Sequence, residues 1–293
     1  MGNLTPAYKK NIKMKLQIKE GTKLINPYQY ANSKDITELI IADTVEEIGD
    51  GAFSGCSNLK KITWGSSVHT IGRAAFAWCI SLKLLHLPDS LKWVGDEAFA
   101  SSGLSYVEFA DNDDVYIDNG VFAFCTRLTC AILPNGLKDI CGGTFLGCTK
   151  LEDVFIPGTV KSIGMMAFGE AGAEEIELPD SIETIYQFAF NKSKLTSIVV
   201  PDSVLEIHHS AFGHCSDLRS VDIGKSVVFV GKMAFEDCPA LSGATFRSSI
   251  IGSIGTYVFK GCKNLKRINV PVSAMDQYKR LLPMHLHKKL VEF

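Results

Sequence analysis

Residues 71–79 read IGRAAFAWC, and close copies of this stretch recur at 48–56 (IGDGAFSGC), 140–148 (ICGGTFLGC) and 230–238 (VGKMAFEDC). Each copy keeps an aliphatic residue, an aromatic residue and a cysteine at the same spacing. The aromatic residue recurs eleven times, at intervals of 22 to 24 residues. These phased aromatic residues are Tyr30, Phe53, Phe76, Phe99, Phe122, Phe145, Phe168, Phe190, Phe212, Phe235 and Phe259. A fixed period of this length indicates a repeat architecture in which stacked units bury a common core.

The second half of each unit follows the pattern L-x-x-I-x-I, as in 151–156 (LEDVFI) and 195–200 (LTSIVV). Alternation of apolar residues with a period of two predicts a strand. The half that contains the aromatic residue is too short for a full helix, so we expect a turn or about one to two turns of 3₁₀ structure there. The chain is therefore predicted to be a strand-rich repeat solenoid of the α/β class, with short 3₁₀ turns and about eleven coils of 22–24 residues.

The phased units, I-G-x-x-A-F-x-x-C followed by L-x-x-I-x-I-P, resemble the BspA-like, or Treponema-type, leucine-rich repeat family over about residues 15–272. The resemblance implies a curved, right-handed array with a parallel β-sheet on its concave side. Members of this family are mostly bacterial surface or secreted proteins implicated in adhesion and protein binding. The resemblance therefore implies a protein partner, with host and extracellular-matrix proteins among the candidates.

The repeat divides the chain into an N-terminal extension (1–14), a leucine-rich-repeat solenoid (15–272) and a C-terminal cap (273–293). In the cap, residues 273–282 have a helical pattern, and 289–293 (KLVEF) are expected to add a final strand that covers the open edge. No apolar stretch near the N-terminus would serve as a signal peptide, so a cytoplasmic location is compatible with this sequence. No apolar run reaches the roughly 18–20 residues that cross a bilayer, and the net charge of −2 argues against nucleic-acid partners.

Seven of the nine cysteines stand three residues after a phased aromatic residue, and Ser102, Ala171 and Ser193 replace cysteine in three coils. Because serine and alanine substitute there, a small buried side chain is favoured over a metal-binding or redox ladder. The histidines lack partners at a metal-ligand spacing, and the acidic loop 110–120 lacks the calcium-loop pattern. No nucleophile, metalloprotease or nucleotide-binding motif is present. We therefore expect no catalytic residue, metal or cofactor.

In each L-x-x-I-x-I strand the third and fifth residues point away from the core. Near the middle of the array these positions hold apolar side chains bordered by carboxylates, a composition typical of interaction surfaces. The predicted partner-binding residues on this concave face are Leu84, Tyr106, Glu108, Cys130, Ile132, Asp153, Phe155, Glu175, Glu177 and Val199. We therefore predict a non-enzymatic protein-binding or adhesion module.

Two alternatives remain open. The first is a polysaccharide hydrolase or lyase of the parallel β-helix kind, whose clustered carboxylates would be Asp153, Glu175 and Glu177. The second is a self-associating structural protein, that is, a homo-oligomer formed through the same patch. A smaller candidate surface consists of bulky residues two positions before or after the phased aromatic residue, namely Met166, Phe188, Met233, Tyr257, Trp78 and Phe124.

Overall fold

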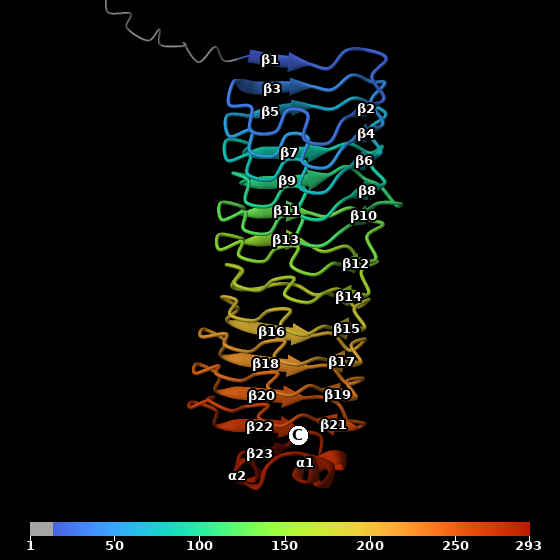
Figure 1. Ribbon diagram of the computed structural model, residues 1–293. Coiled ribbons are helices and arrows are strands. Elements are labelled where there is room, and N and C mark those ends of the chain that lie inside the picture. Colours follow the sequence, from blue (N-terminus) through green and yellow to red (C-terminus); the bar gives the residue numbers. More distant parts are fainter. Residues whose placement is uncertain (1–13) are drawn as a thin grey trace, which may run out of the picture.

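The computed structural model describes residues 14–293, and Figure 1 shows them as a column of stacked coils. Most coils contribute one long strand and one two-residue strand. The long strands are β1 (Met14–Gln17), β3 (Ile36–Ile40), β5 (Lys61–Thr63), β7 (Leu84–Leu87), β9 (Tyr106–Phe109), β11 (Cys130–Ile132), β13 (Asp153–Phe155), β16 (Ser197–Val200), β18 (Ser220–Ile223), β20 (Gly243–Phe246) and β22 (Arg267–Val270). The short strands are β2 (Leu24–Ile25), β4 (Glu47–Ile48), β6 (Thr70–Ile71), β8 (Trp93–Val94), β10 (Tyr116–Ile117), β12 (Asp139–Ile140), β14 (Ser162–Ile163), β15 (Thr184–Ile185), β17 (Glu206–Ile207), β19 (Phe229–Val230) and β21 (Ser253–Ile254). The C-terminal elements are η1 (Val272–Ala274), α1 (Met275–Leu281), α2 (Met284–His287) and β23 (Leu290–Glu292).

The strands lie along two sides of the column (Figure 1). The long strands form the sheets β1-β3-β5, β7-β9-β11-β13 and β16-β18-β20-β22-β23, and the short strands form β10-β8-β6-β4-β2 and β12-β14-β15-β17-β19-β21. Neighbouring strands pair in parallel, for example β9 with β11 and β14 with β15. The predicted solenoid of parallel-strand coils is therefore confirmed. The short-strand sheets were not predicted, because a two-residue strand is too short to show alternation.

The long-strand side is interrupted at 174–178, where the structure has no strand. The sequence pattern predicted a strand that carries Glu175 and Glu177, and this prediction is wrong. The segment begins after Ala173, which stands where the other coils have leucine or isoleucine. The methyl side chain of alanine makes fewer packing contacts than these larger side chains. The backbone there is therefore held less firmly in the hydrogen-bonding geometry of a strand.

The segment around each phased aromatic residue is a run of hydrogen-bonded turns. In the coil of Phe53, the amide of Ala52 donates to the carbonyl of Gly49, whereas the amide of Phe53 donates to the carbonyl of Ala75 in the next coil at 2.8 Å. The expected turn is therefore confirmed, whereas the alternative of one to two turns of 3₁₀ helix is not, because η1 is the one 3₁₀ helix among residues 14–293. Alternate amides bond to the neighbouring coil, so the bonding of a 3₁₀ helix cannot continue.

Two residues before and two residues after each phased aromatic residue, the backbone is left-handed, with φ between 47° and 79°. Sixteen of these positions hold a residue other than glycine, although this conformation costs an L-residue roughly 1–2 kcal/mol. In every coil before that of Phe259, the amides at these positions donate to the next coil, as Trp78 does to the carbonyl of Ala100 at 2.9 Å. Stacking therefore holds the backbone in a conformation that the local sequence does not favour.

The phased aromatic rings form one continuous stack along the inside of the column. Neighbouring ring centroids are 5.0 to 6.0 Å apart, and their planes are within 18° of parallel. Phe145 lies between Phe122 and Phe168 and has no exposed surface. The predicted buried ladder is therefore confirmed.

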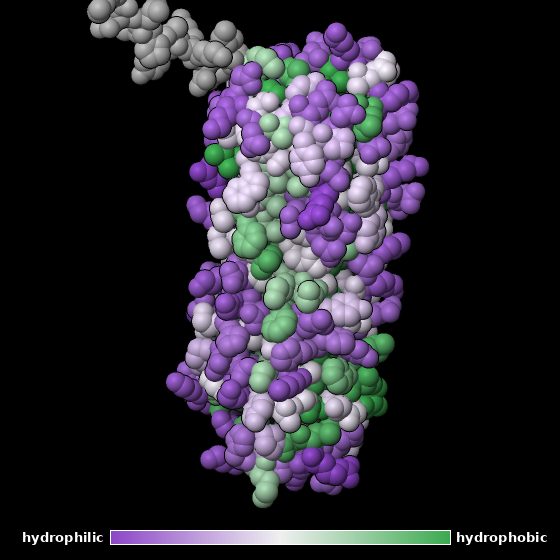
Figure 2. Space-filling model, in the orientation of Figure 1, coloured by the Kyte–Doolittle hydropathy of each residue, from purple (hydrophilic) through white to green (hydrophobic). Residues whose placement is uncertain are grey.

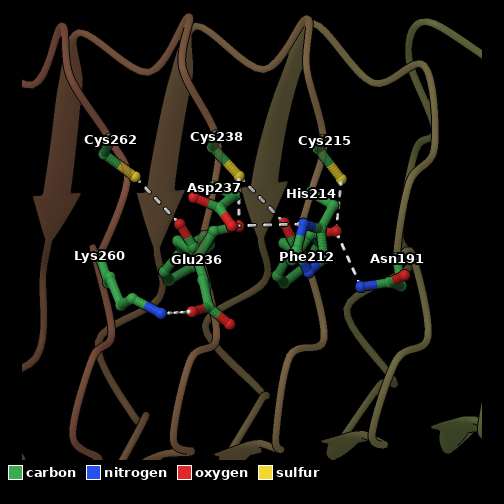
Figure 3. Close-up of polar contacts among 11 residues, drawn as sticks. Asn191, Phe212, His214, Cys215, Glu236, Asp237, Cys238, Lys260 and Cys262 are labelled. Carbon is green, nitrogen blue, oxygen red and sulfur yellow. Dashed lines mark hydrogen bonds and ion pairs between the residues drawn. The ribbon is translucent and has the colours of Figure 1, made fainter.

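The seven phased cysteines are buried and free, as the sequence predicted. Each thiol also donates to the carbonyl of the aromatic residue one coil earlier, at 3.0 to 3.4 Å. Figure 3 shows this contact from Cys238 to Phe212. Burial raises the pKa of the Cys125 thiol to about 11 and raises that of Cys148 well above its ordinary value. The cysteine therefore contributes a hydrogen-bond donor as well as a small side chain.

The C-terminal cap closes one end of the column. The ring of Tyr278 in α1 is buried against Phe246, with centroids 5.4 Å apart, and its hydroxyl donates to the carbonyl of Ser248. A helix was expected at 273–282 and a final strand in KLVEF, and the structure places α1 and β23 there. Met14 belongs to β1 rather than to the expected extension, whose residues 1–13 lie outside the described residues. No helix between residues 14 and 293 is long and apolar enough to span a membrane.

Candidate interaction surface

The long-strand face is the outward side of β3 to β18 and of the segment 174–178. All ten predicted partner-binding residues lie on it. Leu84, Phe155 and Val199 are each 59% exposed, so this face presents large apolar side chains to solvent. Asp153, Glu175 and Glu177 are also exposed, whereas Tyr106, Glu108, Cys130 and Ile132 are half-buried. Figure 2 shows hydrophobic side chains midway along the column, at the height of β11 to β16, and a second hydrophobic area on the right, at the height of β17 to β21.

Strand register brings the central residues of this face together. Tyr106 pairs with Leu84 on one side and with Cys130 on the other, and Cys130 pairs with Asp153. The missing strand at 174–178 does not remove Glu177 from the patch, because it lines the same groove as Phe155 and Val199. The structure therefore places the ten residues on one continuous face.

An acidic groove of about 710 Å³ crosses the face between β13 and β16. Its carboxylates are Glu152, Asp153, Glu175, Glu177, Asp180 and Asp202. Only Asp202 forms an ion pair with another described residue, at 3.2 Å from Arg247 and 3.1 Å from Lys225. The other five carboxylates remain available to a cationic partner.

A second groove, of about 780 Å³, crosses the face near β5 and β7 and is basic. Its cationic residues are Lys60, Lys61, Lys83 and Arg127. Leu84, Ile62 and Trp64 form its apolar wall. These cations were not among the residues predicted from the sequence, although Lys60, Lys61 and Lys83 stand at or just before the start of a predicted strand, which was the available signal.

A hydrogen-bonded cluster separates the two grooves. The hydroxyl of Tyr106 donates to the Glu108 carboxylate at 3.0 Å, and His86 Nδ1 lies 3.0 Å from the same oxygen. Desolvation and the bond to Glu108 raise the pKa of the Tyr106 hydroxyl. These bonds hold Glu108 in place, so it differs from the unpaired carboxylates of the acidic groove.

The smaller candidate surface follows from the left-handed positions. Trp78, Phe124, Met166 and Tyr257 are exposed, whereas Phe188 and Met233 are half-buried. Lys232 and Lys260 lie over the ring of Tyr257, with the ammonium nitrogens 5.9 and 5.6 Å from its centroid. Figure 3 shows that Lys260 also pairs with Glu236. These side chains are spread along the column and do not form one patch like that of the long-strand face.

The polar groups of the face suit recognition better than metal binding. Among residues 14–293, no group of three or more histidine, cysteine or acidic side chains could hold a metal ion. Burial raises the pKa of the Cys130 thiol, and the nearby carboxylate of Asp153 raises it further. A thiol that resists ionisation is a weak nucleophile. The surface therefore offers charge, apolar area and shape to a partner.

Parallel coils of about 23 residues, with one long strand per coil and an aromatic ladder inside, define a leucine-rich-repeat solenoid. A family model described as "BspA type Leucine rich repeat region (6 copies)" matches residues 7–115, 115–242 and 183–280. The chain therefore belongs to the BspA-type leucine-rich repeat family.

Several solved bacterial structures share the fold. The pneumococcal vaccine antigen PcpA is 21% identical, with a TM-score of 0.59 over 94% of this chain and 78% of that chain. A leucine-rich repeat protein from Eubacterium ventriosum is 19% identical, with a TM-score of 0.55 over 97% of this chain and 84% of that chain. A leucine rich cell surface protein from Faecalibacterium prausnitzii is 24% identical, with a TM-score of 0.44 over 92% and 82%. No curated protein matches the chain.

Proposed function

We propose that this protein is a non-enzymatic scaffold that binds another protein through the long-strand face. The observation that carries the proposal is the exposure of Leu84, Phe155 and Val199 on the long-strand face. No other element among the described residues covers them. Burying apolar area there would contribute about 25 cal/mol for each Å² removed from water. Aromatic residues such as Phe155 are enriched at the cores of protein interfaces.

The charge of the acidic groove favours one kind of partner over another. Phe155 and Val199 line this groove together with five carboxylates that have no ion pair among the described residues. An acidic partner would be repelled, and desolvating these carboxylates without a counter-charge would be costly. The proposed partner segment therefore presents apolar side chains beside lysine or arginine.

Membership of the BspA-type family supports a finer proposal, a role in adhesion at the cell surface. Protease treatment of intact cells tests this location. Surface exposure predicts that the protein is digested while a cytoplasmic marker survives. Survival of both proteins would contradict the proposed location without affecting the binding proposal.

The binding proposal is tested by capture of partners with matched baits. The double variant Ile132→Glu/Phe155→Glu puts two charges into the centre of the face. The control variant Tyr116→Glu/Tyr257→Glu changes two aromatic residues on other sides of the column, which are 53% and 57% exposed and so comparable with Phe155. We expect the first bait to lose partners that the parent and the control both retain. Equal capture by all three baits would contradict the proposal.

The enzyme alternative is tested on the same face. Asp153 and Glu177 line the acidic groove, where paired carboxylates could in principle act as acid and base. We expect no release of sugars from a panel of polysaccharides by the parent or by the variant Asp153→Asn/Glu177→Gln. Cleavage by the parent that the variant loses would replace the binding proposal with a catalytic one.

A further inference from the structure

Charged side chains elsewhere on the column pair across neighbouring coils. Lys161 pairs with Glu183 at 2.8 Å, and Lys192 pairs with Glu170 at 3.5 Å. On the long-strand face, Glu38 pairs with Lys15 and Asp222 pairs with Arg247 in the same way, whereas two groups of opposite charge nearer its middle remain separate and unpaired. The lysine cluster consists of Lys60, Lys61 and Lys83, and the glutamate cluster consists of Glu152, Glu174 and Glu175. All six side chains are exposed, and none forms an ion pair with a described residue.

The lysine cluster and the glutamate cluster lie the same number of coils from a common midpoint of the face, on opposite sides of it. Lys83 immediately precedes β7, and Glu152 immediately precedes β13. Lys60 and Lys61 lie at the start of β5, one coil before Lys83. The segment 174–178, which holds the remaining glutamates, lies one coil after β13. The point midway between β7 and β13 lies between β9 and β11. The point midway between β5 and the segment 174–178 is the same.

We propose that the long-strand face pairs with the same face of a second copy of this chain about a two-fold axis. The axis runs parallel to the strands, between β9 and β11. It places β7 opposite β13 of the other copy, and β5 opposite the segment 174–178. Because such an axis preserves strand direction, residues that precede a strand face residues that precede a strand. Each lysine cluster then meets the glutamate cluster of the other copy, which forms six cation–anion contacts in the pair.

The centre of this arrangement combines apolar side chains with two carboxylates from each copy. Tyr106 faces Cys130 of the other copy, and Glu108 faces Ile132, because β9 faces β11. His86 faces Phe155 of the other copy, and Leu84 faces Asp153, because β7 faces β13. Association therefore covers two of the three most exposed apolar side chains of the face. Glu108 enters the interface with its hydrogen bonds to Tyr106 and His86 already made, which lowers the cost of desolvating it.

The area of contact between the two copies limits the affinity with which they associate. Six strand positions, from β5 to the segment 174–178, each about 4.8 Å wide and three to four residues long, give a contact of roughly 29 by 12 Å. This area, about 350 Å² for each copy, is well below the roughly 800 Å² of a standard interface. The pair is therefore a weak dimer, and its charge complementarity makes it sensitive to salt.

This inference rests on the proposed function, because it names a second copy as one occupant of the same face. A foreign partner and a second copy compete for Leu84 and Phe155. The two proposals can nevertheless fail separately. A protein that stays monomeric while Ile132→Glu/Phe155→Glu loses captured partners would overturn the dimer and leave the binding proposal intact.

Charge reversal and sedimentation equilibrium test the pair directly. One variant, Lys60→Glu/Lys61→Glu/Lys83→Glu, makes both clusters acidic, and a second, Glu152→Lys/Glu174→Lys/Glu175→Lys, makes both clusters basic. We expect the parent to dimerise and each variant alone to be monomeric, because like charges meet. An equimolar mixture of the two variants should form a heterodimer, because its acidic face meets a basic one. Restored association in the mixture also shows that both variants are folded.

The control variant Lys161→Glu/Glu183→Lys reverses an ion pair away from the face and should dimerise like the parent. Raising the salt from about 0.01 M to about 1 M shortens the Debye length from about 30 Å to about 3 Å, and should weaken the parent dimer at least about tenfold. A monomeric parent at every concentration would overturn the proposal. So would variants that dimerise alone, or a mixture that does not associate.

Discussion

The interior of the column and the long-strand face are built from the same coils, but their side chains differ from coil to coil to very different extents. Inside, most coils keep the same kind of side chain at each position, with aromatic rings 5.0 to 6.0 Å apart and thiols bonded to the preceding coil. On the long-strand face, Lys61, Leu84, Tyr106, Cys130 and Asp153 occupy equivalent positions in successive coils. An interior residue must fit two neighbours at once, whereas an outward residue need fit none. The interior therefore sets stability, and the face is free to carry recognition.

Removing one rung of the ladder should have the largest effect on stability. Phe145→Ala leaves a cavity between two stacked rings and should lower the free energy of unfolding by about 3–5 kcal/mol. Phe155→Ala makes the same chemical change on the face and should alter it by no more than about 0.5 kcal/mol. Urea unfolding followed by circular dichroism measures both. Equal losses in the two variants would remove the distinction between interior and face.

The pH dependence of stability should show the next largest effect. An unfolded cysteine ionises near its ordinary pKa of 9.0, whereas folded Cys125 stays protonated until the pH nears about 11. Between these values the unfolded state binds fewer protons, so stability falls as the pH rises, by about 1.4 kcal/mol for each pH unit. Unfolding curves from pH 9 to pH 11 should show a shallower fall for Cys125→Ser. An unchanged slope would mean that the pKa of the Cys125 thiol does not differ between the folded and the unfolded protein.

The left-handed turn positions should give the smallest effect. Glu97 is exposed and has φ of 56°, so Glu97→Gly should raise the free energy of unfolding by up to about 1 kcal/mol. The neighbouring Ala98 is buried in the interior, and Ala98→Gly should lower it by about 1 kcal/mol. Thermal melting compares the two variants. Changes of the same sign would contradict the assignment of strain to the turn and of packing to the interior.

The features that were predictable from the sequence are those that repeat. The aromatic ladder follows from the spacing of Phe145 and its equivalents, and the outward direction of Phe155 follows from strand alternation. Both depend on local rules that hold in every coil. The ten candidate residues could therefore be placed on one face, although their role in binding is a proposal.

The features that were missed depend on contacts between coils. Left-handed residues such as Trp78 carry no local signal, because hydrogen bonds to the next coil impose the conformation. The strand expected around Glu175 is absent in a coil where Ala173 replaces a leucine, a single change that the repeat pattern obscures. The lysine cluster was not predicted, because the structure, and not the sequence pattern, places Lys60, Lys61 and Lys83 along one groove.

Two native thiols provide the most direct test of where recognition occurs. Cys130 lies at the centre of the long-strand face, and Cys141 lies on the short-strand side beside Tyr116. Both are partly exposed, whereas the seven phased cysteines are buried. Alkylation rates of the two thiols are measured by mass spectrometry for the dilute protein and for the protein with its partner or second copy bound. Occupied protein should show a slower rate at Cys130 and an unchanged rate at Cys141, whereas protection of Cys141 alone would place binding on the opposite side and contradict the proposal.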